Sequence, residues 1–183
     1  MSKNNGYLIQ PQTSKIQFRI NTPIGEVIAR FQEFSGHFMV TKSGENDEVA
    51  SIDIRSGSLD ADRKLICMML RGEKFFDVEN FPSMSFISRS FEWVNDEHAV
   101  LIGDMTIRNV TRKVVFYVEL KNLESKTSEN YSLEHITVNA SANIRCSDFG
   151  LHRLATVVSN TMSLNVEINA LKVDVATVVA DLD

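Results

Sequence analysis

The sequence predicts an all-β protein, an antiparallel barrel of about eight strands into which one helix is inserted. Two observations support the barrel. Apolar and polar residues alternate with a period of two through most of the chain, which is typical of half-buried strands, and short polar turns separate the alternating runs. The helix is predicted because a single segment changes to helical spacing. At 183 residues the chain is long enough to bury one core, so we expect a single domain over 1–183.

The alternating runs follow one another from the N-terminus. The first four are Ile16 to Ile20, Val27 to Phe31, Phe34 to Val40 and Ala50 to Ile54. The others are Met84 with Phe86, Leu101 to Ile107, Val114 to Leu120, Ile136 to Ile144 and Met162 to Ala170. The barrel core is therefore expected over about 7–171, with a longer loop at 123–132. Residues 172–183 are expected to be a tail that forms a short helix or contacts a partner.

The segment SLDADRKLICMMLRGEKFF interrupts the period of two. Helical spacing is shared by four of its apolar residues, Leu65, Ile66, Met69 and Leu70. We therefore predict a helix between about Ala61 and Arg71. Gly72 is placed to end it, and the candidate N-terminal caps are Ser58, Asp60 and Asp62.

The stretch RGEKFFDVENFPSMSF places two adjacent phenylalanines, Phe75 and Phe76, among charged residues. Large apolar rings in such a setting are expected to turn inward. The sequence thus predicts that both rings are buried and seal the barrel where the helix leaves it. Pro82 then marks the start of the next strand, where a missing N–H is tolerated.

Two polar turns also carry specific predictions. In RNVT, Asn109 can adopt a left-handed backbone more readily than most residues. In RCSDFG, Gly150 can take a positive φ, so this segment is expected to reverse the chain. Arg145 has two interpretations. It is either a structural residue of this turn, or it lies at the mouth of the barrel and pairs with an anionic or carbonyl head group.

Composition and motifs exclude several classes of function. The formal charge of −5 is spread along the chain without a basic cluster, which argues against nucleic acid as a partner. No run is long and apolar enough for a transmembrane helix, and the first residues do not form a secretory signal, so we expect a cytoplasmic protein. The two cysteines are expected to be reduced. The four histidines have no metal-ligand spacing, and catalytic motifs are missing, which argues against an enzyme.

Four stretches together resemble a known family. They are RFQEFSGHF, LRGEKFFDVENFPSMSFISRS, GDMTIRNVTRKVVF and RCSDFGL, and they span most of the chain between Tyr7 and Leu171. The chain resembles the YceI-like family, whose fold is an extended lipocalin-like antiparallel barrel that holds a polyisoprenoid chain. In the helix, Cys67 and Met69 stand where that family usually has Asp and His, so this helix is more apolar.

The resemblance implies a binding protein for an isoprenoid lipid, such as a quinone or a polyprenyl phosphate, with no required cofactor and no catalysis. An eight-stranded barrel is either filled by its own side chains or holds one ligand, and the pattern alone leaves this open. The candidate ligand-binding residues are Phe18, Ile20, Phe31, Phe38, Ile54, Met69, Phe76, Phe86 and Arg145. Two alternatives remain: an enzyme acting on a similar apolar substrate, and a ligand-free interaction module that forms a homodimer.

Overall fold

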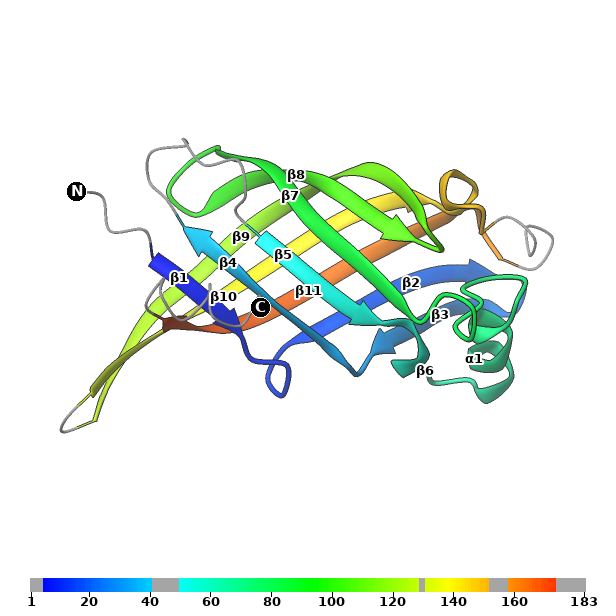
Figure 1. Ribbon diagram of the computed structural model, residues 1–183, viewed down its shortest axis with the longest axis horizontal. Coiled ribbons are helices and arrows are strands. Elements are labelled where there is room, and N and C mark those ends of the chain that lie inside the picture. The colour runs from blue at the N-terminus through cyan, green and yellow to red at the C-terminus, as the bar shows by residue number, and fades with distance from the viewer. Residues whose placement is uncertain (1–4, 41–49, 129–130, 152–157, 174–183) are drawn as a thin grey trace.

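The computed structural model describes residues 5–40, 50–128, 131–151 and 158–173. Eight antiparallel strands within these ranges form a closed ring, which confirms the predicted barrel (Figure 1). In order around the ring they are β1 (Asn5–Ile9), β4 (Phe34–Val40), β5 (Ala50–Arg55), β7 (Ser83–Trp93), β8 (His98–Ile107), β9 (Val110–Ser128), β10 (Tyr131–Arg145) and β11 (Thr161–Val173).

Strand β11 closes the ring and also carries a branch. Its C-terminal part, from Ala170 to Val173, pairs with β1, whereas the part from Met162 to Glu167 pairs with β2 (Lys15–Thr22). Beyond β2 the branch continues through β3 (Gly25–Phe31) to β6 (Leu59–Ala61). Among the described residues β6 has no strand partner besides β3, so β6 is an open edge of the sheet at this end.

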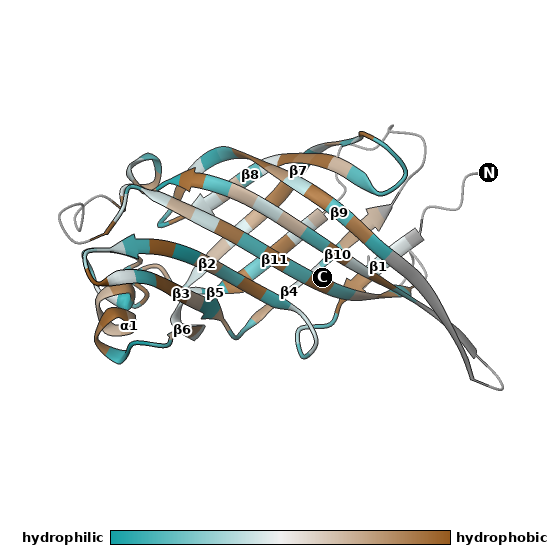
Figure 2. Ribbon diagram, turned by 180° about the vertical axis from the view of Figure 1, so that it is seen from behind, coloured by the Kyte–Doolittle hydropathy of each residue, from teal (hydrophilic) through white to brown (hydrophobic). Residues whose placement is uncertain are grey.

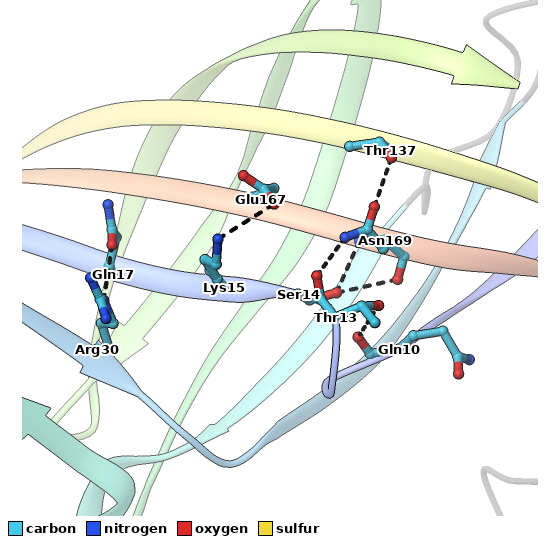
Figure 3. A network of polar contacts seen from close by, with 9 residues as sticks. All are labelled: Gln10, Thr13, Ser14, Lys15, Gln17, Arg30, Thr137, Glu167 and Asn169. Carbon is cyan, nitrogen blue, oxygen red and sulfur yellow. Dashed lines mark hydrogen bonds and ion pairs between the residues drawn. The ribbon is translucent and has the colours of Figure 1, made fainter. Parts of the chain in front are cut away.

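Asn169 fixes the point where the partner of β11 changes (Figure 3). Its backbone N–H donates to Ser14 Oγ at 2.9 Å, and its side-chain amide donates to the Thr13 carbonyl at 2.5 Å. Its Oδ1 accepts a hydrogen bond from Thr137 Oγ1 of β10 at 2.7 Å. The bend that separates β1 from β2 is therefore held to β11 by hydrogen bonds, and Asn169 of β11 is in turn bonded to β10.

Helix α1 (Lys64–Arg71) lies at the open end, next to β6 and the turn between β2 and β3 (Figures 1 and 2). It begins later than predicted, with Arg63 at the N-cap and no side-chain cap, so the predicted caps Ser58, Asp60 and Asp62 are wrong. It ends at Gly72 as predicted. One side of the helix packs on the barrel through Ile66, Cys67 and Leu70, which are buried.

Phe75 and Phe76 follow the helix, and both are buried, as the sequence predicts. The two rings meet edge to face, with centroids 4.9 Å apart. Segment 72–81 therefore covers the open end with aromatic side chains where strand pairing is missing. We call this segment the plug.

Two short 3-10 helices connect other elements. One, η1 (Ser56–Ser58), joins β5 to β6, and the other, η2 (Cys146–Phe149), follows β10. Gly150 ends η2 with φ of 73°, and Asn109 in the turn between β8 and β9 has φ of 59°, so both left-handed predictions are confirmed. Arg108 has φ of 51° as well, which was not predicted.

The predicted loop at 123–132 is wrong, because this region is mostly a hairpin. Pairing of β9 with β10 continues outward to Ser128 and Tyr131, and Figure 1 shows the hairpin projecting beyond the ring. Main-chain hydrogen bonds do not require apolar side chains, so polar composition gives no sign of such an extension. At the C-terminus β11 runs to Val173, two residues into the predicted tail, and residues 174–183 lie outside the described ranges.

Candidate ligand-binding site

An apolar cavity lies inside the barrel and encloses about 90 Å³. Its walls come from eight strands of the ring and branch and from the plug. Apart from Gln17 and Ser85 the lining residues are apolar: Ile16, Phe18, Phe31, Ile52, Ile54, Phe76, Met84, Phe86, Leu101, Met105, Ile107, Phe116, Ala140, Met162, Leu164 and Val166. A site with this lining favours hydrocarbon and offers few partners to a polar or charged group.

Aromatic rings form the rigid part of the lining. Phe76 of the plug meets Phe18 and Phe31 at centroid distances of 5.6 and 5.9 Å, both edge to face. On the other wall Phe86 and Phe116 meet edge to face at 5.1 Å. Such pairs hold the rings in defined orientations, so Phe76 joins the plug directly to the cavity wall.

Methionines form the adaptable part. Met84, Met105 and Met162 come from three different strands and all line the cavity. Their unbranched side chains can fill or vacate irregular space with little change in the backbone. This matters because a cavity of about 150 Å³ is what benzene requires. A chain of several isoprene units therefore needs these side chains to move.

The structure brings five of the nine predicted site residues together at the cavity: Phe18, Phe31, Ile54, Phe76 and Phe86. Ile20 is buried in the core but does not line the cavity. Phe38 stacks on Tyr7 at a centroid distance of 5.2 Å, and Met69 lies on α1, packed against the core. These two side chains contribute to the core around the cavity.

Arg145 lies at the end of β10, opposite Thr161 of β11. Its neighbours Ile144 and Cys146 are buried, whereas Arg145 is exposed, so its side chain points away from the core. Its contact with a ligand head group stays a prediction.

Sequence reasoning missed much of the second wall, which is made by β8, β9, β10 and β11. Leu101, Phe116, Leu164 and Val166 belong to the alternating runs, but alternation does not say which face of a strand points into the barrel. Their position along the barrel axis could not be predicted from the sequence, because it depends on the register between paired strands.

A buried polar contact holds the plug in place. Arg108, in the turn between β8 and β9, donates through Nη1 to the Phe75 carbonyl at 3.1 Å. Its Nη2 lies 3.8 Å from Asp77 Oδ2, and its guanidinium lies 5.2 Å from the centre of the Phe81 ring. The Arg108 and Asp77 side chains are only 16% and 11% exposed. One arginine thus connects three points of the plug to the ring.

The described residues contain no group of three or more side chains that could hold a metal ion. Both cysteines are free and buried. Burial raises the pKa of the Cys146 thiol from 9.0 to about 11, which keeps it in the unreactive protonated form at neutral pH. In the described part of the chain, no helix is both long and apolar enough to span a membrane.

Comparison with solved structures shows barrels of the same fold. BcnA from Burkholderia cenocepacia superposes with a TM-score of 0.75 at 17% identity, covering 88% of this chain and 98% of that chain. The YCEI protein of Campylobacter jejuni gives a TM-score of 0.68 at 20% identity, covering 78% and 83%. A polyisoprenoid binding domain from Saccharophagus degradans gives 0.67 at 14% identity, covering 91% and 98%.

Sequence comparison gives the family. A UPF0312 protein of Pseudomonas putida is 26% identical over 142 residues, which are 78% of this chain and 72% of that protein. The YceI-like domain matches residues 7–170, nearly the whole of the described barrel. The chain therefore belongs to the YceI-like family.

Proposed function

We propose that this protein binds one isoprenoid lipid, a quinone or a polyprenyl phosphate, inside the barrel and stores or carries it. The observation that carries the proposal is the cavity lining, which is almost entirely hydrocarbon and aromatic. The similarity to a domain described as polyisoprenoid binding supports the same ligand class. Binding requires no bond to be broken, so the proposal is not an enzymatic one.

The energetics favour a long apolar chain. Each buried CH₂ contributes about 0.8 kcal/mol, and several isoprene units would exceed the cost of association. Part of this binding free energy is needed to move the side chains that fill the barrel in the present structure. We expect Met84, Met105 and Met162 to account for most of that movement, since the aromatic pairs are more constrained.

Extraction of the purified protein with organic solvent, followed by mass spectrometry, tests the proposal. Recovery of a stoichiometric isoprenoid is the expected result. Ala140 lines the cavity, so Ala140→Leu should fill part of it and lower the recovered amount, whereas Ser141→Leu, on the exposed side of the same strand, should not. If neither the extract nor added quinone or polyprenyl phosphate shows binding, the carrier proposal fails.

The head-group contact of Arg145 has its own test. If Arg145 pairs with a phosphate, Arg145→Ala should weaken a polyprenyl phosphate more than a neutral quinone. Because the side chain is exposed, the ligand end would have to reach the outside of β10 beside η2. An equal loss of affinity for both ligands would instead mark Arg145 as a structural residue of the turn.

A second candidate function is favoured by the small size of the cavity. A barrel with about 90 Å³ of free space is nearly filled by its own side chains, as an interaction module would be. A lipid-free extract together with a concentration-dependent homodimer in analytical ultracentrifugation would support this module. Turnover of the bound lipid would instead indicate an enzyme. A cytoplasmic location stays a prediction of the sequence.

A further inference from the structure

We propose that the α1 end of the barrel is a docking surface for a lipid bilayer, and that an isoprenoid passes between membrane and cavity at this end. The second part rests on the proposed function, whereas the first does not. The surface consists of Ile24, in the turn between β2 and β3, and Leu65 and Met68 of α1. We call these three residues the apolar tip.

The tip residues are unusually exposed for their type. Leu65 is 81% exposed, Ile24 65% and Met68 62%. Leu65 and Met68 are three residues apart on the helix and therefore lie on one side of it. Arg63 Nη1 donates to the Ile24 carbonyl at 2.9 Å, which ties the β2–β3 turn to the start of α1. The three apolar side chains thus belong to one end of the molecule.

The core does not account for these residues. Helix α1 already packs on the barrel with Ile66, Cys67 and Leu70, which are buried. Leu65 and Met68 form a second apolar side that faces away from the barrel. A solvated helix face would ordinarily carry polar residues at such positions.

The charges around the tip fit a membrane surface. Between Arg63 and Gly72 the chain carries Arg63, Lys64 and Arg71 and no acidic residue, although its formal net charge is −5. Basic side chains beside exposed apolar ones are typical of interfacial helices. Acidic residues flank this stretch at Asp60, Asp62 and Glu73, so the attraction to anionic lipid should be modest and the apolar contact should supply most of the binding.

The position of the tip relative to the cavity gives the surface a role. Helix α1 leads directly into the plug, and Phe76 of the plug lines the cavity. This is also the end where β6 has no strand partner besides β3 among the described residues, so a chain could pass beside β6 if the plug moved, without breaking a strand ladder. Isoprenoid chains dissolve in a bilayer. Docking at this end would place the bilayer next to the plug, which covers the cavity.

Flotation of the full chain with vesicles tests docking without any isoprenoid. The probe is vesicles of phosphatidylcholine with phosphatidylglycerol, compared with phosphatidylcholine alone. The double variant Leu65→Ser/Met68→Ser should lower the partition coefficient by roughly tenfold or more. Lys64→Gln should lower it about fivefold on anionic vesicles only. The control is Val94→Ser, because Val94 is 67% exposed and belongs to the turn between β7 and β8, which lies at the opposite end of the barrel from α1 (Figure 1).

The outcomes separate the possibilities. All three tip residues are exposed, so the variants should melt at the temperature of the wild type, and a variant that does not is replaced by Leu65→Gln alone. Equal binding of wild type and tip variant, or equal loss in Val94→Ser, overturns the docking surface. So does a homodimer that the tip variant abolishes. If vesicles bind as expected but no isoprenoid is found in the barrel, docking stands and the carrier proposal fails.

Discussion

Gly103 of β8 illustrates how one missing side chain shapes the cavity. A Cβ at this position would lie 2.5 Å from the Ile87 carbonyl oxygen and 2.5 Å from the Phe86 ring. Phe86 lines the cavity and packs on Phe116. Its position against the sheet is therefore possible only because residue 103 has no side chain.

We expect Gly103→Ala to lower the free energy of unfolding by about 1–3 kcal/mol, the usual cost of overpacking. The carbonyl belongs to the paired strand β7 and cannot move away cheaply. Chemical denaturation measures the effect, and Gly57→Ala is the control, because a Cβ at Gly57 would meet nothing within 4 Å. Equal stabilities of the two variants would contradict this account of Phe86.

The two plug phenylalanines differ in what they contact. Phe75→Ala and Phe76→Ala should each lower the free energy of unfolding by about 3–5 kcal/mol, because both rings are buried. Only Phe76 lines the cavity, so Phe76→Leu should also change the amount of lipid retained, whereas Phe75→Leu should not. Denaturation and solvent extraction of all four variants provide the measurements. Equal lipid retention in the two Leu variants would remove Phe76 from the site.

At the residue scale the sequence predicted which residues are buried better than it predicted which of them line the cavity. Phe18, Ile20 and Phe31, three of the residues proposed from the sequence, are all buried. Alternation could not separate Phe18, at the cavity, from Ile20, beside it in the core, since both have the same parity. Arg108 was missed because a charged residue in a turn is expected to be exposed, and its burial depends on the distant plug.

At the scale of elements, the plug and the β8–β9 turn form one unit although about thirty residues separate them in sequence. The FFD and TIRNV stretches meet where Arg108 contacts the Phe75 carbonyl and Asp77. Removing the guanidinium would leave a buried carboxylate without its cation and a carbonyl without this donor. Both groups cost free energy when they are left unsatisfied.

Arg108→Ala should therefore destabilise the protein by about 1–3 kcal/mol or more, and Arg89→Ala by only about 0–1 kcal/mol. The control pair Arg89–Asp104 is shorter, at 2.6 Å against 3.8 Å, but Arg89 is 68% exposed. A double-mutant cycle with Asp77→Asn measures how much of the loss belongs to the ion pair. A larger loss at Arg89 would show that distance outweighs burial here.

Elements differed in how well the sequence predicted them. The helix was found because four apolar residues repeat at its own period, but its start was placed too early, since Asp60 and Asp62 resemble caps. The outer part of the β9–β10 hairpin was missed because backbone pairing sustains it. Its residues are mostly polar in the sequence, so they show no alternation of apolar and polar side chains.

At the scale of the whole molecule, the pH dependence of stability should contain a step from Cys146. Burial holds its pKa near 11 in the folded state, against 9.0 for the ordinary thiol. Between these values the unfolded chain has released the proton while the folded chain retains it. The contribution to folding is therefore complete below pH 9 and is lost as the pH rises toward 11.

Denaturation of the wild type and of Cys146→Ala from pH 8 to 11 checks this. The difference between their free energies of unfolding should be constant up to about pH 9 and should then shrink. Taking the difference removes the contributions of the ionisable groups that the two proteins share. A difference that stays constant to pH 11 would mean that the thiol is not shielded.

The closed barrel was predictable, but the branch was not. A period of two shows that a strand exists and that its two faces differ, yet it does not identify the neighbours of that strand. The partner change of β11 depends on the bend at Ser14 and on Asn169, two polar residues that the alternation leaves unmarked. The lining of the cavity could not be predicted for the same reason, because it depends on which strands face one another across the barrel.

The open edge of β6, which the plug covers, gives the barrel two mechanically different ends. Where the ring is complete, its circumference is fixed, because any widening breaks a rung of main-chain hydrogen bonds. Where the plug replaces a ladder, rotation of aromatic rings is enough to widen the wall. Amide deuterium exchange should show this as two regimes. Amides in β8 and in the parts of β9 and β10 that lie within the ring should exchange only when the whole molecule unfolds. Those of β6 and the plug should exchange through small local openings that leave the ring intact.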